Sequence, residues 1–178
     1  MRIIQMLLLV LTMHSGFSQS QVPVDSESKI RFKIRNFGFN VNGSFKGLAG
    51  KIVFDPASPG TSLFDVTIDA ATVDTDNNTR DGHLRKEEYF DVKNYPKIRF
   101  VSTRISKSNK EGTLIVFGKL TIKKTTKDVS IPFVAKPASN GYLFNGEFKI
   151  NRLDFDIGKG STISDNLTVS LEVATKKA

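Results

Sequence analysis

Residues 29–35 read KIRFKIR, in which every second side chain is apolar. Ile30, Phe32 and Ile34 fall on one face of an extended chain, and the intervening basic residues fall on the other. A strand with one apolar and one charged face is typical of antiparallel sheets, because the strands of parallel sheets are buried on both faces. This heptapeptide therefore predicts an antiparallel β-sheet that covers a core with one face.

The same alternation recurs in three further segments. Apolar side chains occupy every second position from Phe64 to Ala70, from Val129 to Phe133 and from Leu167 to Val173. Turn-forming residues separate the segments at the spacing of hairpins, at Pro56–Gly60, Asn109–Gly112, Lys123–Thr126 and Ser139–Gly141. About eight or nine strands without a linker or a repeat favour one barrel or sandwich domain.

One segment interrupts the alternation. Residues 74–91 read DTDNNTRDGHLRKEEYFD, which is polar and poor in β-branched residues. Asn77 or Asn78 can cap a short helix here, with Leu84 on its buried side. The predicted fold is therefore all-β with one short helical crossover.

The first 18 residues have the order of a secretory signal peptide. Arg2 is followed by an apolar run from Ile3 to Met13 and then by small residues that include Gly16 and Ser18. The run is about eleven residues long, whereas a membrane-spanning helix needs about 20. We therefore expect cleavage after Ser18, a domain over residues 19–178, and export to the periplasm or secretion.

The composition is basic, with a formal net charge of +8 and no cysteine. Basic proteins can bind nucleic acids, acidic ligands or anionic membrane surfaces. Here the charges are scattered over strand faces and turns, as at Lys123, Lys124 and Lys127, which is typical of a solvated surface. We do not expect an exported protein to bind nucleic acid. Among the partners that a basic protein attracts, an anionic membrane surface is therefore the one that we keep as a possibility.

The sequence offers little catalytic or metal chemistry. His83 is the one histidine of residues 19–178, so a zinc site would need it together with at least two carboxylates. No nucleophile elbow, phosphate-binding glycine loop or HExxH pattern is present. We therefore expect neither an enzyme nor a resident metal ion or cofactor.

Five polar residues stand out, namely Arg80, Asp81, His83, Arg85 and Arg152. In one interpretation, ion pairs and hydrogen bonds tie the crossover to the barrel, because buried charges persist when they are paired. In the other, they receive the polar head of a ligand.

Arg152 has an unusual position in its strand. It continues the inward parity of Phe148 and Ile150, yet the apolar residues after it follow the opposite parity. Either a bulge resets the strand at this point, or the Arg152 side chain enters the interior and meets an acidic partner or the head of a ligand. Asp81 is a candidate for the acidic partner.

Four stretches together resemble the YceI-like polyisoprenoid-binding family. They are residues 28–55, 72–100, 118–133 and 148–158, and they span nearly all of the chain after the signal peptide. The most specific block is TDNNTRDGHL at residues 75–84. The resemblance implies an extended, eight-stranded, antiparallel, lipocalin-like barrel around a long apolar chain, typically an isoprenoid or quinone-like lipid. It also implies an exported protein without catalytic residues.

The resemblance changes one local interpretation and shows three departures. Asn42 and Gly43 alone suggest a hairpin turn, whereas the family places this glycine within a strand, where it marks a bend or a close approach. Family members often have histidine at the position of Asn36, and glycine at the positions of Lys124 and Asp156.

Two functions are consistent with such a barrel. An eight-stranded barrel either holds one small ligand or is filled by its own side chains, and the family resemblance favours the ligand. The first function is thus a carrier or buffer for a long-chain lipid; the alternative is a structural or stress-response barrel that acts through its surface. The oligomeric state stays open, with a dimer among the options. The residues expected to line a lipid site are Phe32, Ile34, Phe39, Phe45, Phe54, Ile68, Phe100, Phe117, Phe133, Phe148 and Ile150.

Overall fold

The computed structural model describes residues 19–159 and 162–178, and the predicted signal peptide, residues 1–18, lies outside them. The strands are β1 (Gln19–Pro23), β2 (Lys29–Asn36), β3 (Phe39–Phe54), β4 (Leu63–Asp74), β5 (Lys97–Lys107), β6 (Leu114–Ile122), β7 (Thr125–Ala138), β8 (Gly141–Asn151) and β9 (Ile163–Lys177). The helices are α1 (Asn78–Leu84) and three 3₁₀ helices, Asp25–Glu27, Pro59–Thr61 and Arg152–Phe155. Within the described residues, no helix is long and apolar enough to cross a membrane.

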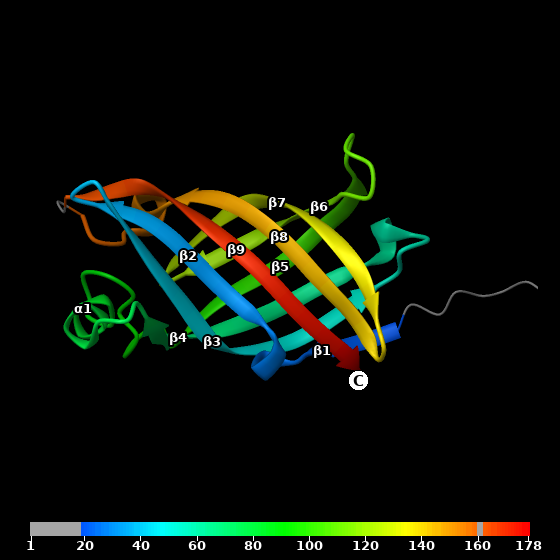
Figure 1. The fold of residues 1–178 in the computed structure, drawn as a ribbon, viewed down its shortest axis with the longest axis horizontal. Coiled ribbons are helices and arrows are strands. Elements are labelled where there is room, and N and C mark those ends of the chain that lie inside the picture. Colours follow the sequence, from blue (N-terminus) through cyan, green and yellow to red (C-terminus); the bar gives the residue numbers. More distant parts are fainter. Residues whose placement is uncertain (1–18, 160–161) are drawn as a thin grey trace, which may run out of the picture.

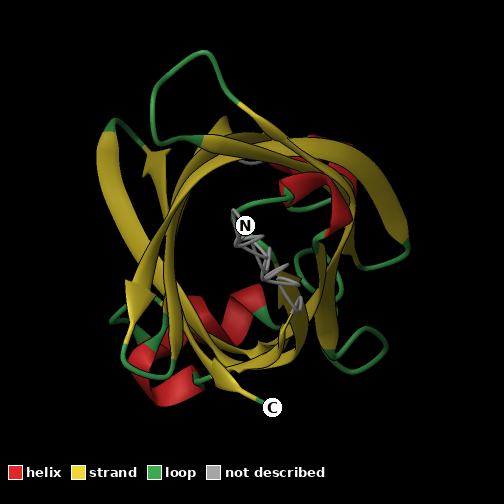
Figure 2. Cartoon of the chain, turned by 90° about the vertical axis from the view of Figure 1, so that its right-hand side faces the viewer, coloured by secondary structure: helices red, strands yellow, loops and turns green. Residues whose placement is uncertain are grey.

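Strands β2 to β9 close into an antiparallel barrel of eight strands (Figure 1). Around the ring the order is β3, β2, β9, β8, β7, β6, β5 and β4, and pairing of β4 with β3 completes it. The closed ring is seen end-on in Figure 2. The short strand β1 is additional to the ring and pairs with the ends of β3 and β9, where Gln21 lies opposite Ile52 and Lys177. The predicted all-β barrel with one short helix is confirmed.

The two ends of the barrel differ in their connections. One end, which we call the crossover end, carries the β2–β3 turn, the connection from β4 to β5 with α1, the β6–β7 turn and the connection from β8 to β9 (Figure 1). The opposite end, which we call the far end, carries the β3–β4, β5–β6 and β7–β8 connections. The predicted cap is also confirmed, since the Asn77 side chain accepts a hydrogen bond from the backbone N–H of Arg80.

The faces predicted from the alternating segments are confirmed. Ile30 is buried, and its neighbour Arg31 is exposed on the outer surface. Strand β3 is 16 residues long and bends, and its register with β4 shifts around Lys46. Gly47 lies within this irregular stretch with a φ of +76°, a backbone conformation that glycine adopts readily.

An aromatic cluster fills the interior at the far end. The rings of Phe54, Phe133, Tyr142 and Phe144 pack with centroid separations between 5.0 and 6.3 Å, mostly edge to face. Such pairs stabilise the fold beyond their area burial. Because these rings lie inside the strand ends, the barrel is closed by side chains on this side.

Candidate functional site

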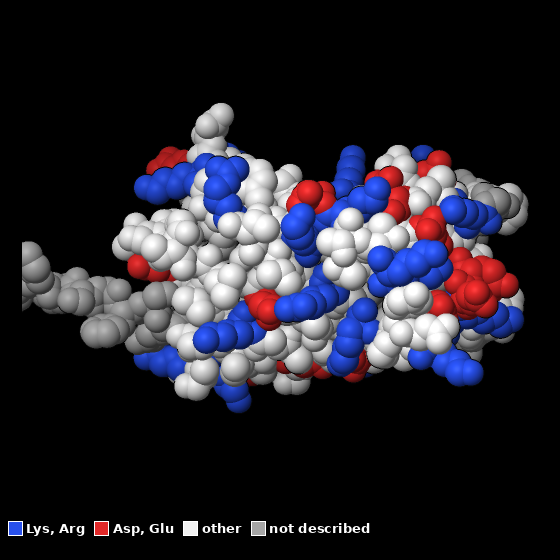
Figure 3. Space-filling view, turned by 180° about the vertical axis from the view of Figure 1, so that it is seen from behind, with Lys and Arg blue, Asp and Glu red and all other residues white. Residues whose placement is uncertain are grey.

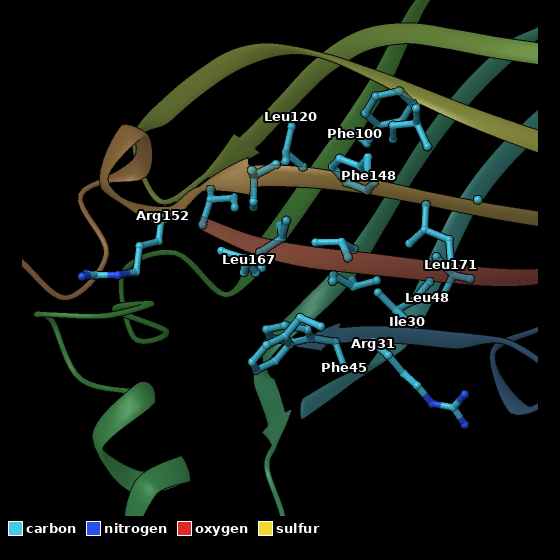
Figure 4. Close-up of a pocket in the computed structure, with 18 of the residues that line it drawn as sticks. Ile30, Arg31, Phe45, Leu48, Phe100, Leu120, Phe148, Arg152, Leu167 and Leu171 are labelled. Carbon is cyan, nitrogen blue, oxygen red and sulfur yellow. The ribbon is translucent and has the colours of Figure 1, made fainter. Parts of the chain in front are cut away.

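The interior of the barrel contains a cavity of about 250 Å³. A single water molecule needs roughly 10–15 Å³ of such space, so the cavity can hold a far larger ligand. Each of the eight barrel strands contributes inward apolar side chains to its wall, which Figure 4 shows for Phe45, Phe100 and Phe148 among others. Arg31 borders the cavity, but its side chain points away from it (Figure 4). A cavity of this size disfavours the alternative of a barrel filled by its own side chains.

Eight of the eleven predicted lining residues border the cavity. They are Phe32, Ile34, Phe45, Ile68, Phe100, Phe133, Phe148 and Ile150. Contact of these side chains with a ligand stays a prediction.

The structure places the other three elsewhere. Phe54 is buried in the far-end cluster, where it packs on Phe133 and Phe144 without bordering the cavity. Phe39 is 78% exposed at the β2–β3 turn. Phe117 lies on the outer face of β6, where the guanidinium carbon of Arg104 is 4.2 Å from its ring centroid. Residues 114–117 are all apolar, so their alternation did not distinguish the inner face from the outer one.

Several lining residues were absent from the predicted set, namely Val66, Leu120, Leu167, Val169 and Leu171. The alternation from Leu167 to Val173 already placed Leu167, Val169 and Leu171 on one face, so the sequence pattern was sufficient to predict these three as lining residues. Leu84, Tyr89 and Phe90 of the crossover also border the cavity.

Two glycines make room for phenylalanine rings in the wall. Gly43 lies directly opposite Phe32, and a Cβ at Gly43 would be 2.2 Å from the Cζ atom of that ring. A Cβ at Gly118 would similarly be 2.5 Å from Cζ of Phe100. The family-based interpretation of Gly43 as a strand residue is therefore correct, because it lies within β3 and its missing side chain leaves room for the ring of Phe32.

A polar network lies beside the cavity at the crossover end. Asp81 is buried and accepts hydrogen bonds from the backbone N–H of Thr75 at 3.0 Å and from its hydroxyl at 2.5 Å. The same hydroxyl accepts a hydrogen bond from Nε of Arg80, and Nη2 of Arg80 donates to the Thr75 carbonyl. Thr75 and Arg80 both border the cavity. Arg80 keeps Nη1 without a hydrogen bond to any described residue, so it has a donor left for a ligand.

Arg152 has a different role from the one that its parity suggested. β8 ends at Asn151, so neither a bulge nor a continuing strand accounts for it. The guanidinium donates to the carbonyls of Ile157, Gly158, Ile163 and Ser164.

The acidic partner of Arg152 is Asp165, at 3.2 Å, and not Asp81. The suggestion of Asp81 was wrong because the guanidinium lies between the residues that follow Arg152 and the start of β9, and these two segments supply its acceptors. The hydrogen bonds of the Arg152 guanidinium thus fasten residues 157 and 158 to the start of β9. The side chain also borders the cavity.

His83 lies exposed on α1, away from the cavity wall. No group of three or more His, Asp or Glu side chains within residues 19–159 and 162–178 is arranged to hold a metal ion. In the same residues every buried side-chain nitrogen or oxygen has a hydrogen-bond partner. The site is therefore an apolar cavity with a hydrogen-bonded polar network at one end, in which Nη1 of Arg80 is the donor left over.

Comparison with known proteins places this barrel among relatives. The family described as YceI-like domain matches residues 23–175. A UPF0312 protein of Pseudomonas savastanoi pv. phaseolicola is 35% identical over 166 residues, which is 86% of each chain.

Solved structures agree with this result. The crystal structure of BcnA from Burkholderia cenocepacia matches with a TM-score of 0.80 and 26% identity, over 85% of this chain and 98% of its own. A polyisoprenoid binding domain from Saccharophagus degradans has the same fold, with a TM-score of 0.71 and 13% identity over 90% of this chain and 99% of its own.

Proposed function

Because the chain belongs to the YceI-like family, we propose that it binds a long-chain isoprenoid or a similar amphiphile, such as a quinone-like lipid, inside its barrel. The observation that carries the proposal is the apolar cavity, whose polar neighbours gather at the crossover end. The description of the Saccharophagus degradans barrel as a polyisoprenoid binding domain supports the same class of ligand.

The shape of the wall suits an extended chain. The lining residues of β9 run from Ile163 to Val173, which is about 33 Å along an extended strand at 3.3 Å per residue. Burial of apolar surface contributes roughly 25 cal/mol per Å². A long hydrocarbon can therefore bind here without a polar contact along most of its length.

The orientation of the ligand follows from the two ends. The far end is closed by the cluster around Phe54 and Phe144, so the hydrocarbon terminus points there. The polar head lies at the crossover end, where Arg80 offers Nη1 as a donor. Asp81 and Arg152 support this end through contacts within the chain, and His83 takes no part.

The test is to identify the bound molecule. Protein purified from its own host is analysed by native mass spectrometry and by extraction with organic solvent, and we expect a lipid of the isoprenoid class. A Val169→Trp variant places an indole in the cavity and lowers the lipid content. Thr168→Trp is its matched control, because Thr168 is the next residue of β9 and faces outward beside Lys33. Wild-type protein without lipid, or equal lipid in the two variants, overturns the proposal.

We further propose that the protein works as an exported carrier or buffer of this lipid. The order of residues 1–18 supports export. Mass spectrometry of the protein from the periplasm or medium should give a chain that starts at Gln19. A full-length chain retained in the cytoplasm contradicts this part of the proposal and leaves the lipid test unaffected.

A further inference from the structure

The β2–β3 turn exposes two aromatic rings at the crossover end. Phe37 is 73% and Phe39 is 78% exposed. Phe37 and Gly38 both have left-handed backbone conformations, with φ of +49° and +82°. Asn and Gly are the residues that such two-residue turns favour, and a bulky side chain at positive φ is uncommon. Core packing gives no reason for Phe37 at this position.

A row of basic side chains leads along β2 to this turn. We call Arg31, Lys33 and Arg35 the basic stripe; all three are exposed on the outer face. Their cross-strand neighbours are uncharged: Ser44 and Ser170 beside Arg31, Asn42 and Thr168 beside Lys33, and Asn40 beside Arg35. None of the three forms a salt bridge with a described residue. The pKa of Glu172 is lowered first by its hydrogen bond to Lys29 and to a smaller degree by Arg31.

The opposite side of the barrel has a different charge pattern. There Arg99 pairs with Asp65, Lys97 with Asp69, and Lys119 with Asp128. Figure 3 shows this side, with acidic and basic residues interspersed. The basic stripe thus lacks the cross-strand ion pairs that Lys97, Arg99 and Lys119 form on the opposite side.

The turn also adjoins the polar end of the cavity. Asn36, the last residue of β2, borders the cavity and accepts a hydrogen bond of 3.4 Å from the Thr162 hydroxyl beside β9. In Figure 1 the β2–β3 turn lies at the same end of the barrel as α1. The exposed rings therefore stand next to the place where a lipid head is expected.

We propose that the crossover end docks on an anionic lipid bilayer, with Phe37 and Phe39 inserted among the headgroups and with Lys33 and Arg35 against lipid phosphates. A bilayer suits this surface better than a protein, because a stable protein interface buries about 800 Å² on each partner, whereas the turn is narrow and convex. Exposed apolar rings next to basic residues are the combination that holds peripheral proteins at a membrane surface. Docking of this kind is a second interaction, separate from ligand binding. It would bring the polar end of the cavity to a bilayer that can supply lipid.

The test measures co-sedimentation of the purified protein with vesicles of phosphatidylcholine alone and of phosphatidylcholine mixed with phosphatidylglycerol. We expect binding to the anionic vesicles that weakens as salt is added. The Phe37→Ser/Phe39→Ser variant should bind at least about tenfold more weakly, because each buried ring contributes apolar transfer energy. Leu63→Ser is the matched control, since Leu63 is 44% exposed at the far end, and it should bind like the wild type.

The contribution of charge is separated by two variants of equal net charge. Lys33→Ala/Arg35→Ala should weaken binding about fivefold for each residue removed. Lys107→Ala/Lys136→Ala removes the same charge at the far end and should leave binding nearly unchanged. Equal losses in the two variants would mean unspecific attraction and would overturn the proposed orientation.

A fluorescent reporter tests insertion directly. The chain has no tryptophan, so Phe37→Trp introduces a single indole whose emission shifts to the blue when it enters a bilayer. Leu63→Trp should show no shift. Absence of a shift at position 37, or wild-type binding by the double serine variant, overturns the proposal. Lipid content measured on the same preparations keeps this result separate from that of ligand binding.

Discussion

The hydroxyl of Thr75 joins two charged side chains that do not touch each other: it donates to the carboxylate of Asp81 at 2.5 Å and accepts from Nε of Arg80 at 2.7 Å. Asp81 is buried and Arg80 borders the cavity. A neutral side chain thus couples the anchoring of the crossover to the orientation of the arginine that we expect at the lipid head.

Thr75→Val removes this hydroxyl while it keeps the shape of the side chain. Both Asp81 and Arg80 then lose a hydrogen bond in a partly buried setting, and we expect the free energy of unfolding to fall by about 1–3 kcal/mol. Urea denaturation followed by circular dichroism measures the change. Thr75→Ser keeps the hydroxyl and should stay close to the wild type, so equal stability of the Val and Ser variants contradicts the coupling.

Gly43→Ala should narrow the cavity. The new Cβ would lie 2.2 Å from Cζ of Phe32, so the ring has to move, and the cavity is the free space beside it. We expect less extractable lipid for each protein molecule and a stability loss of roughly 1–3 kcal/mol from overpacking. At Gly60 an added Cβ meets nothing within 4 Å, so Gly60→Ala is the control.

A second variant identifies the cause of this effect. Combining Gly43→Ala with Phe32→Leu removes the clash, because leucine lacks the ring that the new methyl group meets. Part of the lost stability should return in the double variant. If the double variant loses the sum of the two single effects, the contact between Gly43 and Phe32 is not the cause.

Arg152→Lys should loosen the connection between β8 and β9. A lysine has no planar fork and cannot donate to the carbonyls of Ile157, Gly158 and Ile163 together. Unsatisfied buried carbonyls lower the free energy of unfolding by about 1–3 kcal/mol. Hydrogen exchange should also become faster at the amide of Ile157.

The control for this change is Arg104→Lys, because Arg104 is exposed and contacts the ring of Phe117 on the outer surface. It should leave both the stability and the exchange of Ile157 nearly as in the wild type. A similar response of the two variants would show that Arg152 does not hold the connection.

The pH dependence of stability includes a contribution from Asp65. Its hydrogen bonds to Arg99 lower the pKa of this carboxyl below its ordinary value, against a smaller opposing effect of desolvation. In acid the unfolded chain therefore binds a proton at this site before the folded protein does, so stability falls as pH decreases through this range. Urea denaturation between about pH 5 and pH 2 should show a shallower loss in Asp65→Asn than in the wild type.

The alternation of apolar and polar residues predicted the inner face of β2, β4, β7 and β9, because one buried face leaves a period of two in the sequence. It was uninformative where a strand is apolar throughout, and so Phe117 was assigned to the wrong face. The prediction for Phe39 was wrong for another reason. This residue is the first after a tight turn, where no neighbouring side chains cover its ring.

The polar residues show what the sequence leaves undetermined. The network of Thr75, Arg80 and Asp81 is local in sequence, and its place in the crossover could be predicted. The partners of Arg152 come from the residues just after it and from the start of β9, whose approach depends on the tertiary fold. Most of them are backbone carbonyls, which carry no signature in the side chains.

The pairing of β2 with β9 joins the first long strand of the chain to the last, and Lys29 and Glu172, 143 positions apart, form a salt bridge across this seam. Contacts of such sequence separation form late, since a long loop must close before they can contribute. A nascent chain without β9 has an open sheet and no enclosed interior. If the barrel binds a lipid as we propose, we expect loading to follow closure of this seam, so that the ligand does not act as a template for the barrel during translation.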